Sequence, residues 1–147
     1  MSPHVLFVFL DGVGLGPPHP YNPLAENWPG LERLTCGRRW TDQTRPFSRP
    51  RHVFRHLDAT LGVPGLPQSG TGQTALLTGF NAPRIAGRHY GPYAHSRTRA
   101  VLARYNIFRR LKARGFSVAF ANAYPPVFFE QACQRDRWSV TTRCCRE

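Results

Sequence analysis

A glycine- and threonine-rich stretch, QSGTGQTALLTG at residues 68–79, contains the side chain of this sequence best suited to nucleophilic chemistry. Ser69 is expected just before a helix, where backbone N–H groups and the positive end of the helix dipole attract an anion. Gly70 and Gly72 allow the backbone to approach a phosphate closely. A serine hydroxyl becomes an effective nucleophile when a metal ion or a base assists the loss of its proton. Ser69 is therefore predicted to be either a nucleophile or a helix cap.

A carboxylate directly follows the longest apolar run. Residues 5–10 read VLFVFL, and Asp11 comes next, ahead of a glycine-rich turn. Core packing does not explain an acidic residue in this place. Asp11 either stiffens the turn or supplies an oxygen ligand to a hard cation. Together with the Ser69 hydroxyl, it is a candidate metal ligand.

Two nucleotide-binding motifs are lesser alternatives. GTGQTAL, at residues 70–76, is similar to the GTGKTAL of many ATPases, but Gln73 replaces the lysine that reaches the outer phosphates. The first glycine of that motif would fall on Pro67, and no strand precedes the loop. DGVGLG has the spacing GxGxG rather than the GxGxxG of dinucleotide-binding folds. A degenerate P-loop stays open only as a minor possibility.

The elements that must position these residues follow from the apolar pattern. Buried strands are expected within residues 4–16 and at residues 116–123. Helices are expected at residues 30–34, 52–62, 72–78 and 97–114, and again after the two prolines at 125–126. A strand, several helices and a second strand in this order predict an α/β fold with parallel strands. Ligands of such folds bind at the carboxyl ends of the strands, where Asp11 is expected.

Several motifs together resemble the alkaline phosphatase superfamily, which includes sulfatases, nucleotide pyrophosphatases and cofactor-independent phosphoglycerate mutases. In that superfamily a Ser, Thr or Cys nucleophile stands ten residues before the glycine of a Thr-Gly pair, as Ser69 does before Gly79. TALLTG is similar to the SLLTG of sulfatases, and GLPQS is similar to the segment before the mutase serine. Asp11-Gly12 matches the Asp-Gly that supplies a metal ligand, and NPLAENWPGLERL resembles the segment after it. Gln73 stands where the mutase branch has histidine, which argues against mutase activity proper.

The resemblance implies a fold, a chemistry and a set of site residues. The fold would be a partial three-layer α/β sandwich with a mostly parallel sheet. The chemistry would be transfer of a phosphoryl or sulfuryl group from a small anionic ester, with Ser69 as nucleophile and two divalent cations, Mn or Zn. The metal ligands would include Asp11 and Ser69, and the substrate contacts would be Gly70, Gln73, His89 and Asn122. His89 and Asn122 are equally well interpreted as an exposed loop histidine and a turn residue.

Most metal ligands of that superfamily are Asp and His residues of the C-terminal half. After Ser69 the only acidic residues are Glu130, Asp136 and Glu147, and the last histidine is His95. His52 and His56 have a spacing that can bind zinc, although this spacing more often marks a solvated helix face. We therefore expect residues 1–135 to be the N-terminal part of a metalloenzyme domain and residues 136–147 to be a truncated or irregular tail. This chain is expected to be weakly active or inactive.

The net charge of +12 raises the alternative of a basic binding module for nucleic acid. Nineteen of the twenty basic residues are arginines, scattered along the chain, and aromatic residues are not interleaved with them in any stacking pattern. A compositional bias explains this pattern, so nucleic acid is not an expected partner.

The four cysteines form no CxxC pair and are expected to be free thiols. The longest apolar run is too short to cross a membrane, and a cytoplasmic location is expected.

Overall fold

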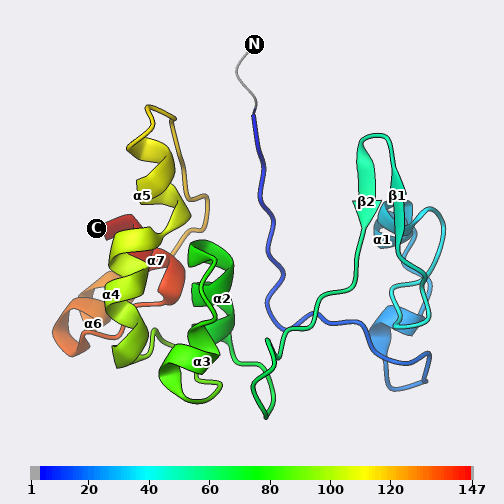
Figure 1. Ribbon diagram of the computed structural model, residues 1–147, viewed down its shortest axis with the longest axis horizontal. Helices are drawn as coiled ribbons and strands as arrows, with labels where there is room; N and C mark the ends of the chain where they lie inside the picture. Colours follow the sequence, from blue (N-terminus) through cyan, green and yellow to red (C-terminus); the bar gives the residue numbers. More distant parts are fainter. Residues whose placement is uncertain (1–3, 147) are drawn as a thin grey trace. The chain divides into compact units, whose positions relative to one another are not determined.

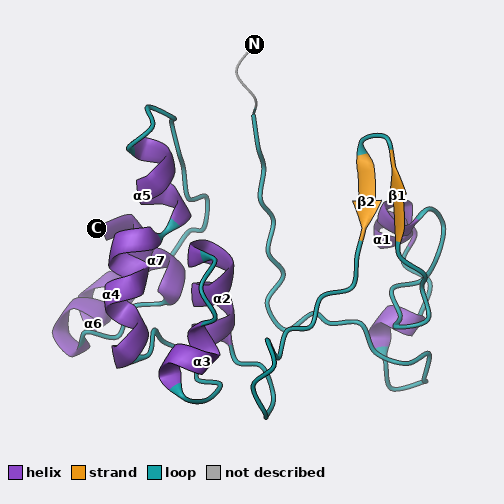
Figure 2. Ribbon diagram, viewed as in Figure 1, coloured by secondary structure: helices purple, strands orange, loops and turns teal. Residues whose placement is uncertain are grey.

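The chain divides into two units that differ in how they are held together. The computed structural model describes residues 4–146, apart from the side chains of residues 145 and 146. Unit 1 covers Met1–Leu57 and unit 2 covers Asp58–Glu147. Unit 1 contains a hairpin and short helical turns, whereas the regular structure of unit 2 is helical (Figures 1 and 2).

An antiparallel hairpin is the regular centre of unit 1. Strands β1 (Phe47–Arg49) and β2 (His52–Phe54) pair with Phe47 opposite Phe54 and Arg49 opposite His52. A two-residue turn joins them, with Arg51 at a φ of 63°. Three short helical elements precede the hairpin: η1 (Pro23–Ala25), α1 (Pro29–Glu32) and η2 (Arg33–Thr35).

Hydrogen bonds of side chains to backbone carbonyls hold unit 1 together. Its buried residues among those described are the threonines Thr35, Thr41 and Thr44. The hydroxyl of Thr35 donates to the carbonyl of Arg38, and the Trp40 indole N–H donates to the Leu31 carbonyl at 2.9 Å. Each such bond contributes only about 0.5–1.5 kcal/mol net, so unit 1 depends on many of them together.

Unit 2 is a bundle of short helices. They are α2 (Ser69–Thr78), α3 (Ala82–Ala86), α4 (Ser96–Tyr105), α5 (Ile107–Lys112), α6 (Pro126–Arg135) and α7 (Val140–Arg146). Buried apolar residues of α2, α4, α7 and the loop before α4 meet in one cluster, with Phe108 packed against it. The cluster consists of Leu77, Ala94, Leu102, Val140 and Cys144.

The boundary between α4 and α5 is set by a buried asparagine. The Asn106 side chain donates to the Leu102 carbonyl at 2.9 Å, and its oxygen accepts the N–H of Arg109 at 2.9 Å. The side chain therefore ends one helix and caps the next, and asparagine is among the residues favoured at an N-cap. The single helix predicted for residues 97–114 is accordingly two helices, and Gly115 follows at a φ of 80°.

The structure is mixed α/β, but the predicted mostly parallel sheet is wrong for the described residues. Their sheet has two antiparallel strands, β1 and β2, and β2 comes from a segment predicted to be a helix. Residues 5–10 are extended and exposed, with Val5 88% and Leu6 87% accessible. Residues 116–123 also form no strand. An apolar run becomes a strand only when a neighbour completes its backbone hydrogen bonds.

Other predictions from the sequence have mixed outcomes. The helix after the two prolines is confirmed as α6, and the one at residues 30–34 corresponds to α1 and η2. The helix predicted for residues 52–62 is wrong, because His52–Phe54 is strand β2. The division of the chain at residue 135 stays a prediction, and α7 shows that much of the expected tail is helical. Among the described residues, no helix combines the length and apolar character that crossing a membrane requires.

Truncation of Leu102 tests the core of unit 2. Leu102 is fully buried on α4, so Leu102→Ala leaves a cavity and should lower the free energy of unfolding by about 2–5 kcal/mol. Urea denaturation followed by circular dichroism measures this loss. Leu76→Ala is the matched control, because Leu76 is 46% exposed on α2 and should cost about 1 kcal/mol or less. Equal losses for the two variants would contradict this core.

The ion pairs of Asp136 predict a pH-dependent contribution to stability. Arg143 and Arg99 each donate to this carboxylate at 2.8 Å. The hydrogen bond from Arg143 is the main reason that the pKa of Asp136 lies below its ordinary value of 3.8. A depressed pKa stabilises the fold above the unfolded-state pKa, and this contribution is lost as pH falls through the folded-state pKa.

We expect Asp136→Asn to lower the midpoint of urea unfolding at pH 7 and to lower it less at pH 2. Asparagine is a suitable replacement because position 136 has a φ of 47°, a conformation that asparagine tolerates. Unfolding midpoints of the native chain and the variant at the two pH values check this expectation. A difference that persists undiminished in acid would show that the carboxylate charge is not responsible.

Candidate functional site

Ser69 is the first residue of α2, not its cap. The residue before the helix is Gln68, which has an extended backbone with φ of −127° and ψ of 145° and makes no side-chain capping bond. The helix begins three residues earlier than the sequence predicts and ends where Gly79 adopts a φ of 79°. The interpretation of Ser69 as an N-terminal cap is therefore wrong. The spacing from Ser69 to Gly79 corresponds to the full length of α2 and its C-terminal cap.

The loop before α4 is fixed to the start of α2 by reciprocal hydrogen bonds. The N–H of Thr71 donates to the Tyr90 carbonyl at 2.9 Å, and the N–H of Tyr90 donates to the Thr71 hydroxyl at 3.2 Å. Thr71 is fully buried. This exchange occupies one of the backbone donors at the start of the helix, which water or a ligand would otherwise satisfy.

Gly70 is required by this loop contact. A Cβ atom at position 70 would lie 2.1 Å from the carbonyl oxygen of Tyr93 and 2.6 Å from that of Tyr90. No side chain fits in that space. Gly72, in contrast, has no atom within 4 Å of an added Cβ. The structure therefore gives Gly70 a packing role, and its predicted contact with substrate stays a prediction.

Gly91 lies over the first amides of α2. A Cβ at position 91 would lie 3.3 Å from the backbone nitrogen of Ser69 and 3.4 Å from that of Gly70. Position 91 therefore packs closely against these two amides, and an added side-chain carbon would be crowded there. Backbone amides at a helix start are suited to an anionic oxygen.

A shallow cavity of about 470 Å³ adjoins the same region. It is lined by Pro64, Gly65, Leu66, Gln68, Arg88, His89, Tyr90 and Gly91. Arg88 is exposed, and its guanidinium carbon lies 5.9 Å from the centre of the Tyr90 ring. The Nε2 atom of His89 lies 3.0 Å from the Val63 carbonyl oxygen. Since a carbonyl only accepts, Nε2 carries the proton, and Nδ1 is the accepting nitrogen of the neutral ring.

His89 also affects the pKa of a nearby carboxylate in unit 2, that of Asp58. Asp58 accepts hydrogen bonds from the Thr60 hydroxyl at 2.6 Å and the Thr60 N–H at 2.9 Å. The pKa of Asp58 lies below its usual value, mainly because of the hydrogen bond from the Thr60 hydroxyl. The charge of His89 makes a smaller contribution in the same direction. No motif in the sequence indicated that this carboxylate lies near His89.

The predicted site residues are distributed over both units. Ser69 and Gln73 lie one turn apart on α2 and are both half-buried, and the loop of His89 contacts the start of that helix. Asn122 is exposed in the irregular segment before α6. Asp11 is exposed in unit 1, so the metal site predicted to join it to Ser69 stays a prediction. Among the described residues, no three His, Cys, Asp or Glu side chains lie together as a metal ion would require.

Sequence reasoning missed the roles of Thr71, Tyr90 and Arg88. Thr71 and Tyr90 are nineteen residues apart, and Tyr90 takes part through its backbone atoms, which leave no pattern of side-chain types in the sequence. Arg88 is one arginine among nineteen, and composition alone does not distinguish it. The only available signal was the glycine at position 91, within the motif GRHYGP.

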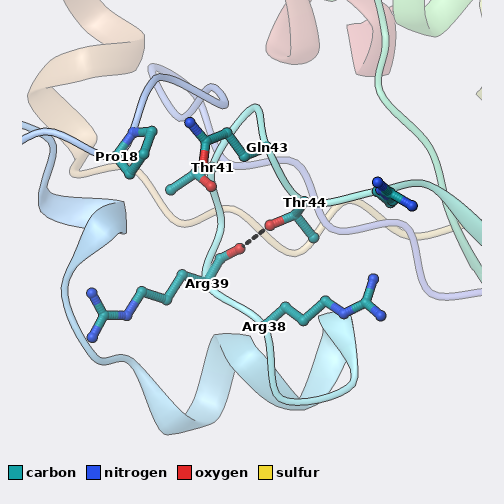
Figure 3. A pocket seen from close by; sticks show the side chains of 7 residues that line it. Pro18, Arg38, Arg39, Thr41, Gln43 and Thr44 are labelled. Carbon is teal, nitrogen blue, oxygen red and sulfur yellow. Dashed lines mark hydrogen bonds between the residues drawn. The ribbon is translucent and has the colours of Figure 1, made fainter.

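A second cavity, of about 590 Å³, lies in unit 1 (Figure 3). It is lined by Pro18, Arg38, Arg39, Thr41, Gln43, Thr44 and Arg45. The side chains of Arg38 and Arg39 extend away from each other, and Arg39 donates to the Ala25 carbonyl at 2.7 Å. Because these guanidinium groups do not converge, the cavity is a less suitable anion site than the start of α2.

Substitution of the two helix glycines tests the loop contact. Gly70→Ala should displace the loop that carries Tyr90 and Tyr93 and lower the free energy of unfolding by about 1–3 kcal/mol, as overpacking does. Gly72→Ala should instead raise it by about 0.5–1 kcal/mol, because alanine favours a helix interior. Urea unfolding of both variants measures the difference. Equal effects would mean that the loop does not contact α2 in this way.

No family model matches the sequence, and no curated protein or solved structure shows significant similarity to it. The function proposed next therefore rests on the residues and contacts of this chain, together with the motifs already described.

Proposed function

We propose that this chain carries the nucleophile of a metal-dependent phosphoryl- or sulfuryl-ester hydrolase or transferase related to the alkaline phosphatase superfamily. Ser69 is the nucleophile, and the substrate is a small anionic phosphate or sulfate ester. The location proposed is the cytoplasm. The three-layer sandwich of that superfamily belongs to this proposal and not to the described fold.

The observation that carries the proposal is the position of Ser69 at the first turn of α2. The loop that carries Gly91 packs closely against the first two amides of this helix, since a Cβ atom at position 91 would lie 3.3 Å from the Ser69 nitrogen. A cavity lined by Arg88 and His89 adjoins this point. Helix-start amides and a guanidinium group both favour a dianionic ester over a neutral one. The high net positive charge of the chain attracts such a substrate.

The residues assigned to this site account for binding and for one bond exchange. The Ser69 oxygen attacks phosphorus, the bond from phosphorus to the ester oxygen breaks, and the alcohol leaves. The product is a phosphoseryl group, which water hydrolyses or a second hydroxyl accepts. Arg88 and the α2 amides stabilise the negative charge on the phosphoryl oxygens.

The metal part of the proposal is not met by the described residues. Two divalent cations, Mn or Zn, require several carboxylate and imidazole ligands, and no such group is assembled among residues 4–146. The sequence after Ser69 has three acidic residues. We therefore assign no step to a metal ion, and we propose that this chain by itself turns over slowly or not at all.

An exposed aromatic pair favours the alternative of a basic module for single-stranded nucleic acid. The rings of Phe80 and Tyr105 lie 5.0 Å apart, and the guanidinium carbon of Arg104 lies 5.4 Å from the centre of the Tyr105 ring. Aromatic faces beside arginines stack bases in such proteins. This alternative requires no chemistry from Ser69 and predicts salt-sensitive binding.

Transfer of a phosphoryl group to Ser69 tests the proposed function. After incubation with an aryl phosphate and Mn²⁺ or Zn²⁺, we expect peptide mass spectrometry to find phosphoserine at position 69, even where turnover is slow. Ser69→Ala should abolish this label. Ser96→Ala is the matched control, because Ser96 also opens a ten-residue helix, α4. Label at Ser96 to the same extent as at Ser69 would contradict a specific nucleophile. Fast turnover by the chain alone would contradict the proposal that it turns over slowly or not at all.

A further inference from the structure

A cysteine, an arginine and a histidine of unit 1 form a cluster away from Ser69. Cys36 is exposed, directly after η2. The Arg49 guanidinium donates to the Cys36 sulfur at 3.4 Å, and His52 Nδ1 lies 3.8 Å from the same sulfur. The sulfur is therefore in contact with both a cation and a possible proton acceptor.

The hairpin places Arg49 and His52 together. The two residues are opposite each other in the β1–β2 pair, at the end nearest the turn. Both pack on Phe47: the His52 ring meets it edge-on at 4.9 Å, and the Arg49 guanidinium carbon lies 5.3 Å from its centre. Packing on one ring restricts both side chains, so the cluster is organised before any reactant arrives.

The second nitrogen of His52 fixes its hydrogen-bonding role. His52 Nε2 lies 2.8 Å from the Leu34 carbonyl oxygen, which only accepts. Nε2 therefore carries the proton in the neutral ring, and Nδ1 presents its lone pair to the Cys36 sulfur. A nucleophile, a base beside it and a third group that orients the base form the arrangement of an activated thiol.

The backbone at Cys36 is held in an uncommon conformation. Its φ of 58° and ψ of 46° lie in the left-handed region, which residues other than glycine seldom occupy. Such conformations cost free energy and persist where the surroundings impose them, often at functional positions. Here the turn brings the Cys36 sulfur into contact with Arg49 and His52 of the hairpin.

A zinc site does not explain the cluster. Cys36 and His52 supply two ligands, and no third His, Cys, Asp or Glu joins them in the described part of the chain. His56, which the sequence placed one helical turn from His52, instead has its Nε2 atom 2.7 Å from the Thr44 carbonyl oxygen. The arrangement serves thiol chemistry rather than metal binding.

We propose that Cys36 is a modification site for thiol–disulfide exchange with low-molecular-weight disulfides that carry carboxylates. His52 Nδ1 accepts the thiol proton as the sulfur attacks one sulfur of the disulfide. A new bond joins Cys36 to that half of the reagent, the original disulfide bond breaks, and the departing thiolate takes the proton from His52. Arg49 has further N–H donors, which bind a carboxylate of the reagent.

The experiment uses the full chain and oxidised glutathione as the probe. Peptide mass spectrometry measures the rates of modification at Cys36 and at Cys133, an exposed thiol on α6 that serves as an internal control. We expect Cys36 to react about tenfold faster or more, since general-base assistance contributes at least this much. In urea the two rates should become similar, because only the fold assembles the cluster. Similar rates in the folded chain would overturn the proposal.

Two variants separate the roles of the base and the cation. His52→Gln keeps a donor for the Leu34 carbonyl but removes the base. It should slow the modification of Cys36 by about tenfold and leave the rate at Cys133 unchanged. Arg49→Gln should slow the reaction with glutathione disulfide more than that with cystamine, a cationic disulfide. Unchanged rates at Cys36 in His52→Gln would contradict activation by His52. Equal slowing with both reagents in Arg49→Gln would contradict carboxylate recognition.

Discussion

The arrangement around the candidate nucleophile depends on the close approach of one backbone segment to another. The carbonyls of Tyr90 and Tyr93 reach the space that a side chain at position 70 would occupy. Thr71 then exchanges hydrogen bonds with Tyr90 and fixes the loop to α2. This contact holds the Arg88–Gly91 segment beside the helix start. The geometry of the candidate site is thus a consequence of how a loop packs on a glycine.

Both units bury threonines whose hydroxyls are hydrogen-bonded. In unit 2, α2 buries Thr71, Thr74 and Thr78 on the face that also carries Leu77. The hydroxyls of Thr74 and Thr78 donate to carbonyls one turn earlier, at 2.7 Å, so their polar atoms are satisfied inside the helix. Unit 1 has a polar interior that relies on similar bonds to loop carbonyls. Satisfied threonines therefore substitute for apolar side chains in both units.

Both candidate reactive groups lie where a helical element meets a loop or hairpin. Ser69 opens α2, and Cys36 follows η2. In each case backbone groups are left without partners inside the helix, and segments from elsewhere in the chain approach them. The serine site is proposed to bind an anionic ester. The thiol site has a base and a cation already in contact with sulfur, and so requires less further organisation.

Local patterns in the sequence determined the parts of the structure that neighbouring residues control. The two prolines at the start of α6 and the glycine after α5 were sufficient to predict helices there. Ser69 was correctly expected at a helix start, although the helix begins earlier than predicted. These features depend on backbone preferences and on hydrogen bonds that span only a few residues.

Tertiary structure alone decided the pairing of strands and the assembly of both sites. Residues 5–10 have the composition of a buried strand, yet a strand exists only with a partner, and composition does not specify one. The contact between Thr71 and Tyr90 joins residues nineteen positions apart, and that between Cys36 and His52 joins residues sixteen apart. Such contacts depend on how loops close and pack, because the free energy of a distant contact is set by the whole fold rather than by adjacent residues.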